Sequence, residues 1–256
     1  MPQRAQSAIL SRMNLSSIPF TSLVGKLLRL PLRVLPKSTV VPVLQGQLRG
    51  SRWIVGSSTH GCWLGTYEYE NQHLFASIVP AKSTVYDIGA NVGFYTLLAA
   101  SRAKRVIAVE PLAENVAYLE RHLDLNGVCN VEVWSAAVAD KEGEEPFAVS
   151  GDRSQGKLGR EGPMVRTVTL DRLCEICGTP ALIKVDVEGA EYRVLLGAQK
   201  CLAAHRPIIL MSTHSISLHR ACVTLLTNNG YDVQQVGNDG LLARRRLRTA
   251  DGPGSL

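Results

Sequence analysis

Short apolar runs alternate with longer segments of helical periodicity along most of this chain. Strand-length runs lie at 84–88, 106–109, 131–138, 181–187 and 207–211, and helical segments lie at 94–101, 113–126, 192–204 and 217–229. A short helix is expected from Leu170, with Thr169 as its cap, and short strands are expected near 145–149, 165–169, 231–236 and 240–243. This alternation predicts an α/β fold: a mostly parallel central sheet with helices on both faces and an antiparallel pair at its end.

The segment before residue 84 has a different pattern. Two apolar runs flank Arg49-Gly50 and predict an N-terminal β-hairpin at 39–48 and 51–57. Residues 60–68 are expected to form a loop, followed by a helix that ends near Val79. We therefore expect four parts: a basic leader at 1–38, a hairpin, loop and helix covering the site at 39–83, the main domain at 84–248, and a flexible tail at 249–256.

The run from Asp87 to Gly93 is the most informative stretch. A strand leads into a turn bounded by Gly89 and Gly93, and an apolar helix follows directly. Glycines permit backbone angles closed to other residues and let a ligand approach the main chain. The next strand ends in Glu110, placed to accept hydrogen bonds from two ribose hydroxyls. The turn itself, expected to hold the ligand, comprises Asp87, Gly89, Ala90, Asn91 and Gly93.

The spacing of this turn limits the ligand. It follows Gly-x-x-x-Gly and lacks the Gly-x-Gly-x-x-Gly fingerprint that cradles a pyrophosphate. An adenosine ligand without a diphosphate is favoured, which points to S-adenosylmethionine before NAD. Ser135 and Ala136 end the third strand, where small residues would let an adenine ring lie against the backbone. Trp63, Tyr67 and Glu68 precede the sheet and are candidates for a lid over the ligand, or else for ordinary packing.

A second group of polar residues follows two later strands. Lys184 and Asp186 share one strand face, and Glu188 lies just past the strand end. Burying such charges is expensive unless they are paired or used. The alternatives are a functional rim or a structural Lys–Asp pair with a helix N-terminal acid. His214 ends the next strand on the same rim, where it could accept a proton from a hydroxyl nucleophile. Three other histidines, His122, His205 and His219, are expected to be exposed on helices.

Charge is unevenly distributed along the chain. Residues 1–67 hold eight Lys or Arg and no acid, whereas the rest carries 20 basic and 22 acidic residues. The leader could be solvated, contact an anionic membrane surface, target the protein or bind nucleic acid. The six cysteines show no disulfide framework, and Cys174-x-x-Cys177 lacks a second pair at zinc spacing. A cytoplasmic protein is expected, with peripheral membrane contact through the leader as an option.

Several runs of this sequence resemble the FkbM-type methyltransferases over roughly residues 50–236. They are 85–96, Val109-Glu110-Pro111, 136–140, 169–173 and, most specifically, the run Lys-x-Asp-x-Glu-Gly-Ala-Glu at 184–191. The resemblance implies a Rossmann-like class I methyltransferase fold, S-adenosylmethionine as cofactor, and hydroxyl groups of sugars or natural products as acceptors. One departure is Ser212-Thr213-His214, where many members of the family carry Glu-x-His.

These observations predict methylation of a hydroxyl on a sugar, glycan or natural product by direct in-line transfer. His214 would take the proton, and Asp186 and Glu188 would complete the catalytic rim. The predicted cofactor residues are Glu68, Asp87, Gly89, Ala90, Asn91, Gly93, Glu110, Pro111, Ser135 and Ala136. No metal is required, although Asp186 and Glu188 could hold a divalent cation, and nucleic acid is not expected as a partner. The alternatives are an RNA or protein methyltransferase, a NAD-dependent oxidoreductase and a non-catalytic cofactor-binding or scaffold protein.

Overall fold

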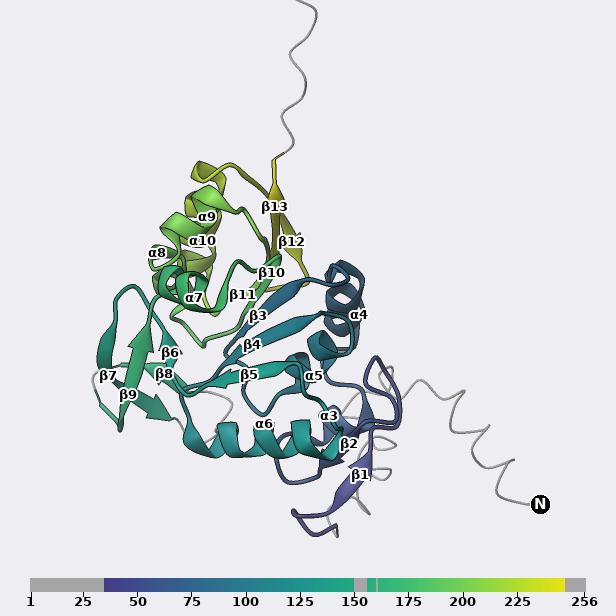
Figure 1. The fold of residues 1–256 in the computed structure, drawn as a ribbon. Helices are drawn as coiled ribbons and strands as arrows, with labels where there is room; N and C mark the ends of the chain where they lie inside the picture. The colour runs from purple at the N-terminus through teal and green to yellow at the C-terminus, as the bar shows by residue number, and fades with distance from the viewer. Residues whose placement is uncertain (1–34, 150–155, 160, 247–256) are drawn as a thin grey trace, which may run out of the picture.

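A seven-stranded sheet forms the centre of the molecule. The computed structural model describes residues 35–149, 156–159 and 161–246 (Figure 1). The strands of the main sheet are β3 (Thr84–Ile88), β4 (Arg105–Val109), β5 (Val131–Trp134), β10 (Leu182–Val185), β11 (Ile208–Ser212), β12 (Tyr231–Val236) and β13 (Gly240–Arg245). They lie in the order β12-β13-β11-β10-β3-β4-β5, with β13 antiparallel to both β11 and β12 and the other pairs parallel. The mostly parallel sheet is thus confirmed.

Helices cover both faces of this sheet, as the hydrophobic pattern predicts. They are α3 (His60–Leu64), α4 (Tyr69–Ile78), α5 (Phe94–Ala100), α6 (Ala113–Leu125), α7 (Leu170–Cys177), α8 (Glu191–Leu196), α9 (Gln199–Ala204) and α10 (Ile216–Asn228). Side chains alternate between two cores along each central strand. Val85 belongs to the core formed with residues of α3 to α6, whereas Tyr86 belongs to the core formed with residues of α7 to α10. The fold is the Rossmann-like class I methyltransferase arrangement, with the strand order reversing between β3 and β10.

A second, smaller sheet lies beside the carboxyl ends of the central strands. Its strands are β6 (Ala137–Val138), β7 (Gly143–Val149), β8 (Gly156–Leu158) and β9 (Met164–Val168), in the order β6-β9-β7-β8. The single strand predicted at 131–138 is therefore wrong. The chain leaves the main sheet after Trp134, and β6 pairs in parallel with β9. Between the two predicted strands near 145–149 and 165–169 lies an additional strand, β8, which pairs with β7, while residues 150–155 and 160 lie outside the described residues.

The helix predicted at 192–204 is two helices, α8 and α9. Asp171 at the start of α7 explains where the second one begins. Its two carboxylate oxygens accept the backbone N–H groups of Lys200 and Cys201, at 3.1 and 2.8 Å. These are free N–H groups of the first turn of α9, so Asp171 caps that helix from another element.

The predicted hairpin forms, with strands shorter than expected: β1 (Val40–Pro42) pairs antiparallel with β2 (Arg52–Ile54). Residues 60–64 of the predicted loop form α3 instead. The hairpin is attached to α6 through His122, which is fully buried, contrary to the prediction that it is exposed. The ring accepts the N–H of Ile54 at 3.1 Å, bonds to the carbonyl of Val92 at 2.8 Å, and stacks on Trp53.

Most of the basic leader, residues 1–34, and the tail at 247–256 lie outside the described residues. Within 35–149, 156–159 and 161–246, every helix is too short or too polar to cross a bilayer.

Candidate active site

The turn after β3 lies at the point where the strand order reverses. Gly89 has a φ of 78°, and a Cβ atom on it would lie 1.9 Å from the carbonyl oxygen of Asp186. Only glycine fits both the backbone angle and this close approach. Gly93, with a φ of 95°, ends the turn and begins α5. The turn therefore brings the ends of β3 and β10 together, as the sequence pattern requires.

Glu110, at the end of β4, holds this turn in place. One carboxylate oxygen accepts the N–H of Asn91 at 2.9 Å, and the other accepts the N–H of Leu112 and the side-chain amide of Asn115, both at 3.1 Å. The residue is 5% exposed, and burial raises the pKa of its carboxyl. A carboxylate has about four acceptor positions, so ribose hydroxyls would share these oxygens with the protein.

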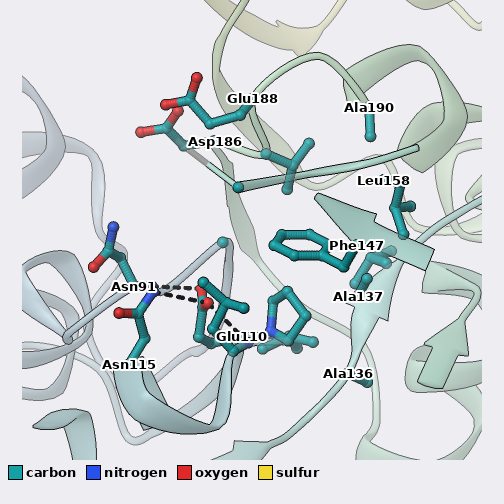
Figure 2. A pocket seen from close by; sticks show the side chains of 17 residues that line it. Asn91, Glu110, Asn115, Ala136, Ala137, Phe147, Leu158, Asp186, Glu188 and Ala190 are labelled. Atoms are coloured by element: carbon teal, nitrogen blue, oxygen red, sulfur yellow. Dashed lines mark hydrogen bonds between the residues drawn. The ribbon is translucent and has the colours of Figure 1, made fainter. Parts of the chain in front are cut away.

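A hollow opens beside Glu110, and we call it the Glu110 hollow (Figure 2). Its wall includes Pro111 and the small residues Ala136 and Ala137, whereas Ser135 is exposed and lies outside this wall. The ring of Phe147, from β7, projects into the hollow and leaves a free volume of about 50 Å³. That is less than twice the volume of about 30 Å³ that one water molecule takes in the liquid, and far too little for an aromatic ring system. A bound adenine would therefore displace or stack on the Phe147 ring, a contact that the sequence pattern did not indicate.

A second hollow lies on the other side of the turn, and we call it the turn hollow. Gly89, Ala90 and Asn91 line it together with a group contributed by the N-terminal part, namely Ser58, Thr59, Cys62 and Tyr67. Glu68 supports this wall, because its carboxylate accepts the hydroxyl of Tyr95 at 2.7 Å. Of the predicted lid residues, Tyr67 thus lines a hollow, while Trp63 is 4% exposed and belongs to the core.

Lys184 is buried between two acids. Its Nζ lies 3.7 Å from Asp87 and 3.5 Å from Asp186, and 4.8 Å from the centre of the Tyr95 ring. Burial opposes the charge on Lys184, but the two carboxylates outweigh it and raise the pKa of the amine. Asp87 itself is fully buried on β3, where Thr96 donates to it at 2.6 Å. Asp87 therefore holds α5, which follows the turn, through its hydrogen bond with Thr96, and it positions Lys184 through its charge.

His214 lies on the rim after β11, as predicted, and three acids surround it. Its Nε2 is 3.3 Å from Glu188 and 3.7 Å from Asp186, and its Nδ1 is 2.6 Å from Glu191. Glu191, in the first turn of α8, is fully buried and also accepts the N–H of Gly189. The hydrogen bond to Glu191 raises the pKa of His214 to about 9, with Glu188 and Asp186 adding to the effect and burial opposing it.

Glu191 is the residue at this rim that the sequence interpretation missed. It places a carboxylate against His214, which in this chain is preceded by Ser212-Thr213 and not by the acid of Glu-x-His. A carboxylate on Nδ1 fixes the tautomer and orientation of an imidazole and leaves Nε2 to act. The sequence does contain a signal for Glu191: it ends the 184–191 run and follows Glu188 by three residues, at the start of a helix.

Of the five non-glycine residues with positive φ among the described residues, three lie in this part of the molecule. Glu68, Asn91 and Glu188 have φ values of 42°, 50° and 51°, in the left-handed region that non-glycine residues rarely adopt. Each lies at an edge of the two hollows or beside His214. Such strain persists where the surroundings impose it, and it is frequent at functional sites.

The rim also has the donors for a cation. Donor atoms of Asp186, Glu188 and His214 lie within 4.8 Å of one another, close enough for one divalent ion. In the present arrangement Nε2 of the imidazole lies within ion-pair distance of both carboxylates, 3.7 Å from Asp186 and 3.3 Å from Glu188. The geometry is therefore compatible with either a protonated histidine or a metal ion at this position.

Comparison with known proteins adds sequence evidence. The sequence profile of the Methyltransferase FkbM domain matches residues 87–233. The AMB antimetabolite synthetase AmbE of Pseudomonas aeruginosa is 28% identical over 247 residues, which cover 73% of this chain and 12% of that protein. The chain thus matches only a small part of the length of that relative.

Two solved methyltransferase structures can be superposed on part of the chain. An FkbM methyltransferase from Methylobacillus flagellatus KT is 20% identical with a TM-score of 0.46, over 72% of this chain and 53% of that chain. A ribosomal protein L11 methylase from Lactobacillus delbrueckii subsp. bulgaricus is 16% identical with a TM-score of 0.48, over 71% and 80%.

Proposed function

This chain belongs to the FkbM methyltransferase family, and we propose that it methylates a hydroxyl group of a sugar, glycan or other natural product, with S-adenosylmethionine as methyl donor and His214 as the proton acceptor. The observation that carries the proposal is the histidine held by Glu191 at the rim where the strand order reverses. Methyl transfer to a hydroxyl requires a group that removes the hydroxyl proton, and an oriented imidazole can do so.

The residues around the turn fit this cofactor. The Gly89 turn leaves room for a close approach to the main chain, and Glu110 stands beside a hollow with small residues on its wall. Bound S-adenosylmethionine supplies a methyl group on a positively charged sulfur. The site carries six carboxyl groups, those of Glu68, Asp87, Glu110, Asp186, Glu188 and Glu191. The basic groups of the site are Lys184 and His214. The electrostatic potential of the site therefore favours a cationic ligand over the anionic diphosphate of NAD.

The proton path uses residues of this chain alone. Glu191 holds Nδ1 of His214, and Nε2 faces Asp186 and Glu188 on the side of the two hollows. A hydroxyl on that side would donate its proton to Nε2, and Glu191 would stabilise the resulting imidazolium. The histidine can do this only in its neutral form, so its raised pKa makes turnover increase with pH up to about 9.

Two grounds support the proposed methyl acceptor: the family to which the chain belongs and the chemistry of the residues at the rim. The named relative is an antimetabolite synthetase, which supports a natural-product acceptor. A macromolecular acceptor remains the second candidate from the sequence, but the acidic rim disfavours a phosphate backbone.

Calorimetry with S-adenosylhomocysteine and with NAD tests the cofactor assignment. S-adenosylhomocysteine should bind the wild type, and Glu110→Ala should lose on the order of 1.5–3 kcal/mol of binding free energy, because a charged acceptor is removed. Glu110→Gln, which keeps the shape, should lose less. The matched control is Glu120→Ala, an exposed acid on α6, which should bind as the wild type does. Binding of NAD without binding of S-adenosylhomocysteine would overturn the proposal.

A further inference from the structure

Two cysteines from different helices meet on the α7 to α10 side of the main sheet, and we call them the thiol pair. The thiol of Cys174, on α7, donates to the sulfur of Cys201, on α9, and the two Sγ atoms are 2.9 Å apart. Cys201 is 2% exposed and belongs to the core of α7 to α10, whereas Cys174 packs against that core and keeps part of its surface in solvent. The two residues are 27 positions apart in sequence, so the fold alone brings them together.

The backbone around the thiol pair is held by hydrogen bonds. Asp171 lies one turn before Cys174 on α7, and its carboxylate accepts the N–H of Lys200 at 3.1 Å and that of Cys201 at 2.8 Å. The N–H of Asp171 donates to the carbonyl of Gly197, between α8 and α9, at 2.8 Å. These bonds hold the start of α9 against α7. Disulfide formation needs two cysteines whose side chains already face each other, and the thiol pair meets that condition.

Cys177, the other cysteine of the motif Cys174-x-x-Cys177, points elsewhere. It is 4% exposed, and its Sγ lies 3.8 Å from the carboxylate of Glu132 on β5. Two cysteines whose side chains point apart cannot be joined without a movement of the backbone. The structure therefore pairs Cys174 with a cysteine of another helix and not with its neighbour in the motif.

The surroundings keep the Cys174 thiol protonated near neutral pH. The hydrogen bond with Cys201 raises the pKa of Cys174, and burial and the charges of Asp171 and Glu175 act in the same direction. The thiolate is the nucleophile in disulfide exchange, so the thiol pair reacts slowly and needs an excess of oxidant or an alkaline pH. Cys174 is the more exposed of the two residues and is therefore the one that meets the oxidant.

We propose that Cys174 and Cys201 form a reversible disulfide, with a low-molecular-weight disulfide such as glutathione disulfide as the oxidant. The thiolate of Cys174 attacks one sulfur of the oxidant, and one glutathione leaves as its thiolate. The thiolate of Cys201 then attacks the sulfur of Cys174 in the mixed disulfide and displaces the second glutathione. Two protein thiols are oxidised, the disulfide of the oxidant is reduced, and the two protons of the protein thiols pass to the two glutathione thiolates.

The new bond fastens the corner between α8 and α9 to α7. It closes the chain between residues 174 and 201 into a loop and so lowers the entropy of the unfolded state. α8 begins with Glu191, which holds His214, so the fastened corner supports the helix that carries this acid. Among the described residues, those that line the Glu110 hollow and the turn hollow include neither cysteine. The disulfide is therefore expected to act on stability, independently of the proposed methyl transfer.

Peptide mapping by mass spectrometry, after treatment of the full chain with glutathione disulfide at about pH 8, tests the proposal. The remaining thiols are alkylated without reduction, and the wild type should yield a linked pair of peptides that contain Cys174 and Cys201. Dithiothreitol should separate the two peptides again. The oxidised wild type should have a Tm about 5–15 °C above that of the reduced protein, as expected for a disulfide that closes a loop of this size.

Variants of single cysteines identify the partners. Cys174→Ser and Cys201→Ala should each lose both the linked peptides and the rise in Tm. Cys177→Ala removes the other thiol of α7, and Cys129→Ser removes an exposed thiol, so both serve as matched controls and should keep the link and the rise in Tm. Each reduced variant should unfold in a single cooperative thermal transition, which shows that it folds.

Three results would overturn the proposal. They are a link between Cys174 and Cys177, links between molecules through Cys129 without a link inside the molecule, and a link between Cys174 and Cys201 that leaves Tm unchanged. The first two would show that the fold does not select the thiol pair, and the third would show that the bond does not fasten α9 to α7. The assignment to the methyltransferase family does not depend on any of them.

Discussion

His214 depends on a carboxylate that is distant in sequence. Glu191 precedes it by 23 residues and reaches Nδ1 from α8. Sequence position placed His214, Asp186 and Glu188 on one rim because the carboxyl ends of parallel strands share an edge. It did not place Glu191, because that contact depends on how α8 packs on α10. Phe147 was missed for a similar reason, since β7 belongs to a second sheet that the sequence pattern did not predict.

The raised pKa of His214 predicts a pH-dependent stability. An unfolded histidine titrates near 6.5, and the folded one at about 9. The folded state thus holds a proton that the unfolded state has lost between these values. The stabilisation is complete below pH 6.5 and disappears as pH rises through 9. We expect the free energy of unfolding of the cofactor-free protein to fall by about 1–3 kcal/mol across this window.

Glu191→Gln separates this contribution from others. Glu191→Gln removes the largest cause of the raised pKa of His214 while keeping a hydrogen-bond acceptor. The fall in the free energy of unfolding with rising pH should therefore become shallower. Glu175→Gln, an exposed acid on α7, serves as control and should keep the wild-type slope. Denaturant unfolding at pH steps from 6 to about 9.5 measures both. An unchanged slope in Glu191→Gln would show that Glu191 does not hold the proton on His214.

At the scale of helices and strands, the hydrophobic periodicity predicted the regular elements of the core but not the places where the chain breaks them. The strands at 84–88 and 231–236 have the predicted bounds. The broken helix at α8 and α9 was missed because Asp171, which caps α9, acts from α7. The hairpin was predicted from its turn, whereas its attachment through His122 was not. A histidine on an amphipathic helix is ordinarily exposed, and tertiary contacts decide otherwise here.

His122 should control stability on the acid side. Burial lowers the pKa of its ring to about 4, below the unfolded value near 6.5. The unfolded state therefore binds an extra proton in this window, and stability falls as pH drops from 6.5 to 4. The contribution is up to about 3 kcal/mol. His122→Asn should be less stable at pH 7 and should show a flatter acid limb in denaturant unfolding.

The exposed His205 provides the control for this measurement, because His205→Asn should leave the acid limb as steep as in the wild type. If His122→Asn keeps the wild-type dependence from pH 4 to 6.5, its ring is not the group that is protonated on unfolding.

At the scale of the whole molecule, charge is divided between an acidic rim and a basic leader. The leader was expected to be solvated or to contact a membrane, and residues 1–34 lie outside the described residues. If it binds anionic lipid, deletion of residues 1–34 should abolish salt-sensitive binding to phosphatidylserine vesicles and leave the affinity for S-adenosylhomocysteine unchanged. This truncation keeps Lys37, whose carbonyl accepts the N–H of Gly56. Equal vesicle binding by both forms would remove the membrane role.

The whole account depends on what His214 does, and turnover of His214→Asn tests this most directly. Once an acceptor is found, saturating S-adenosylmethionine isolates the chemical step from cofactor binding. We predict a fall in turnover of about 10²–10⁴-fold with cofactor affinity close to the wild type, because asparagine keeps some hydrogen bonding and cannot take the proton. Wild-type turnover in this variant, or activity that chelator abolishes and Mg²⁺ restores, would contradict a histidine base at this rim.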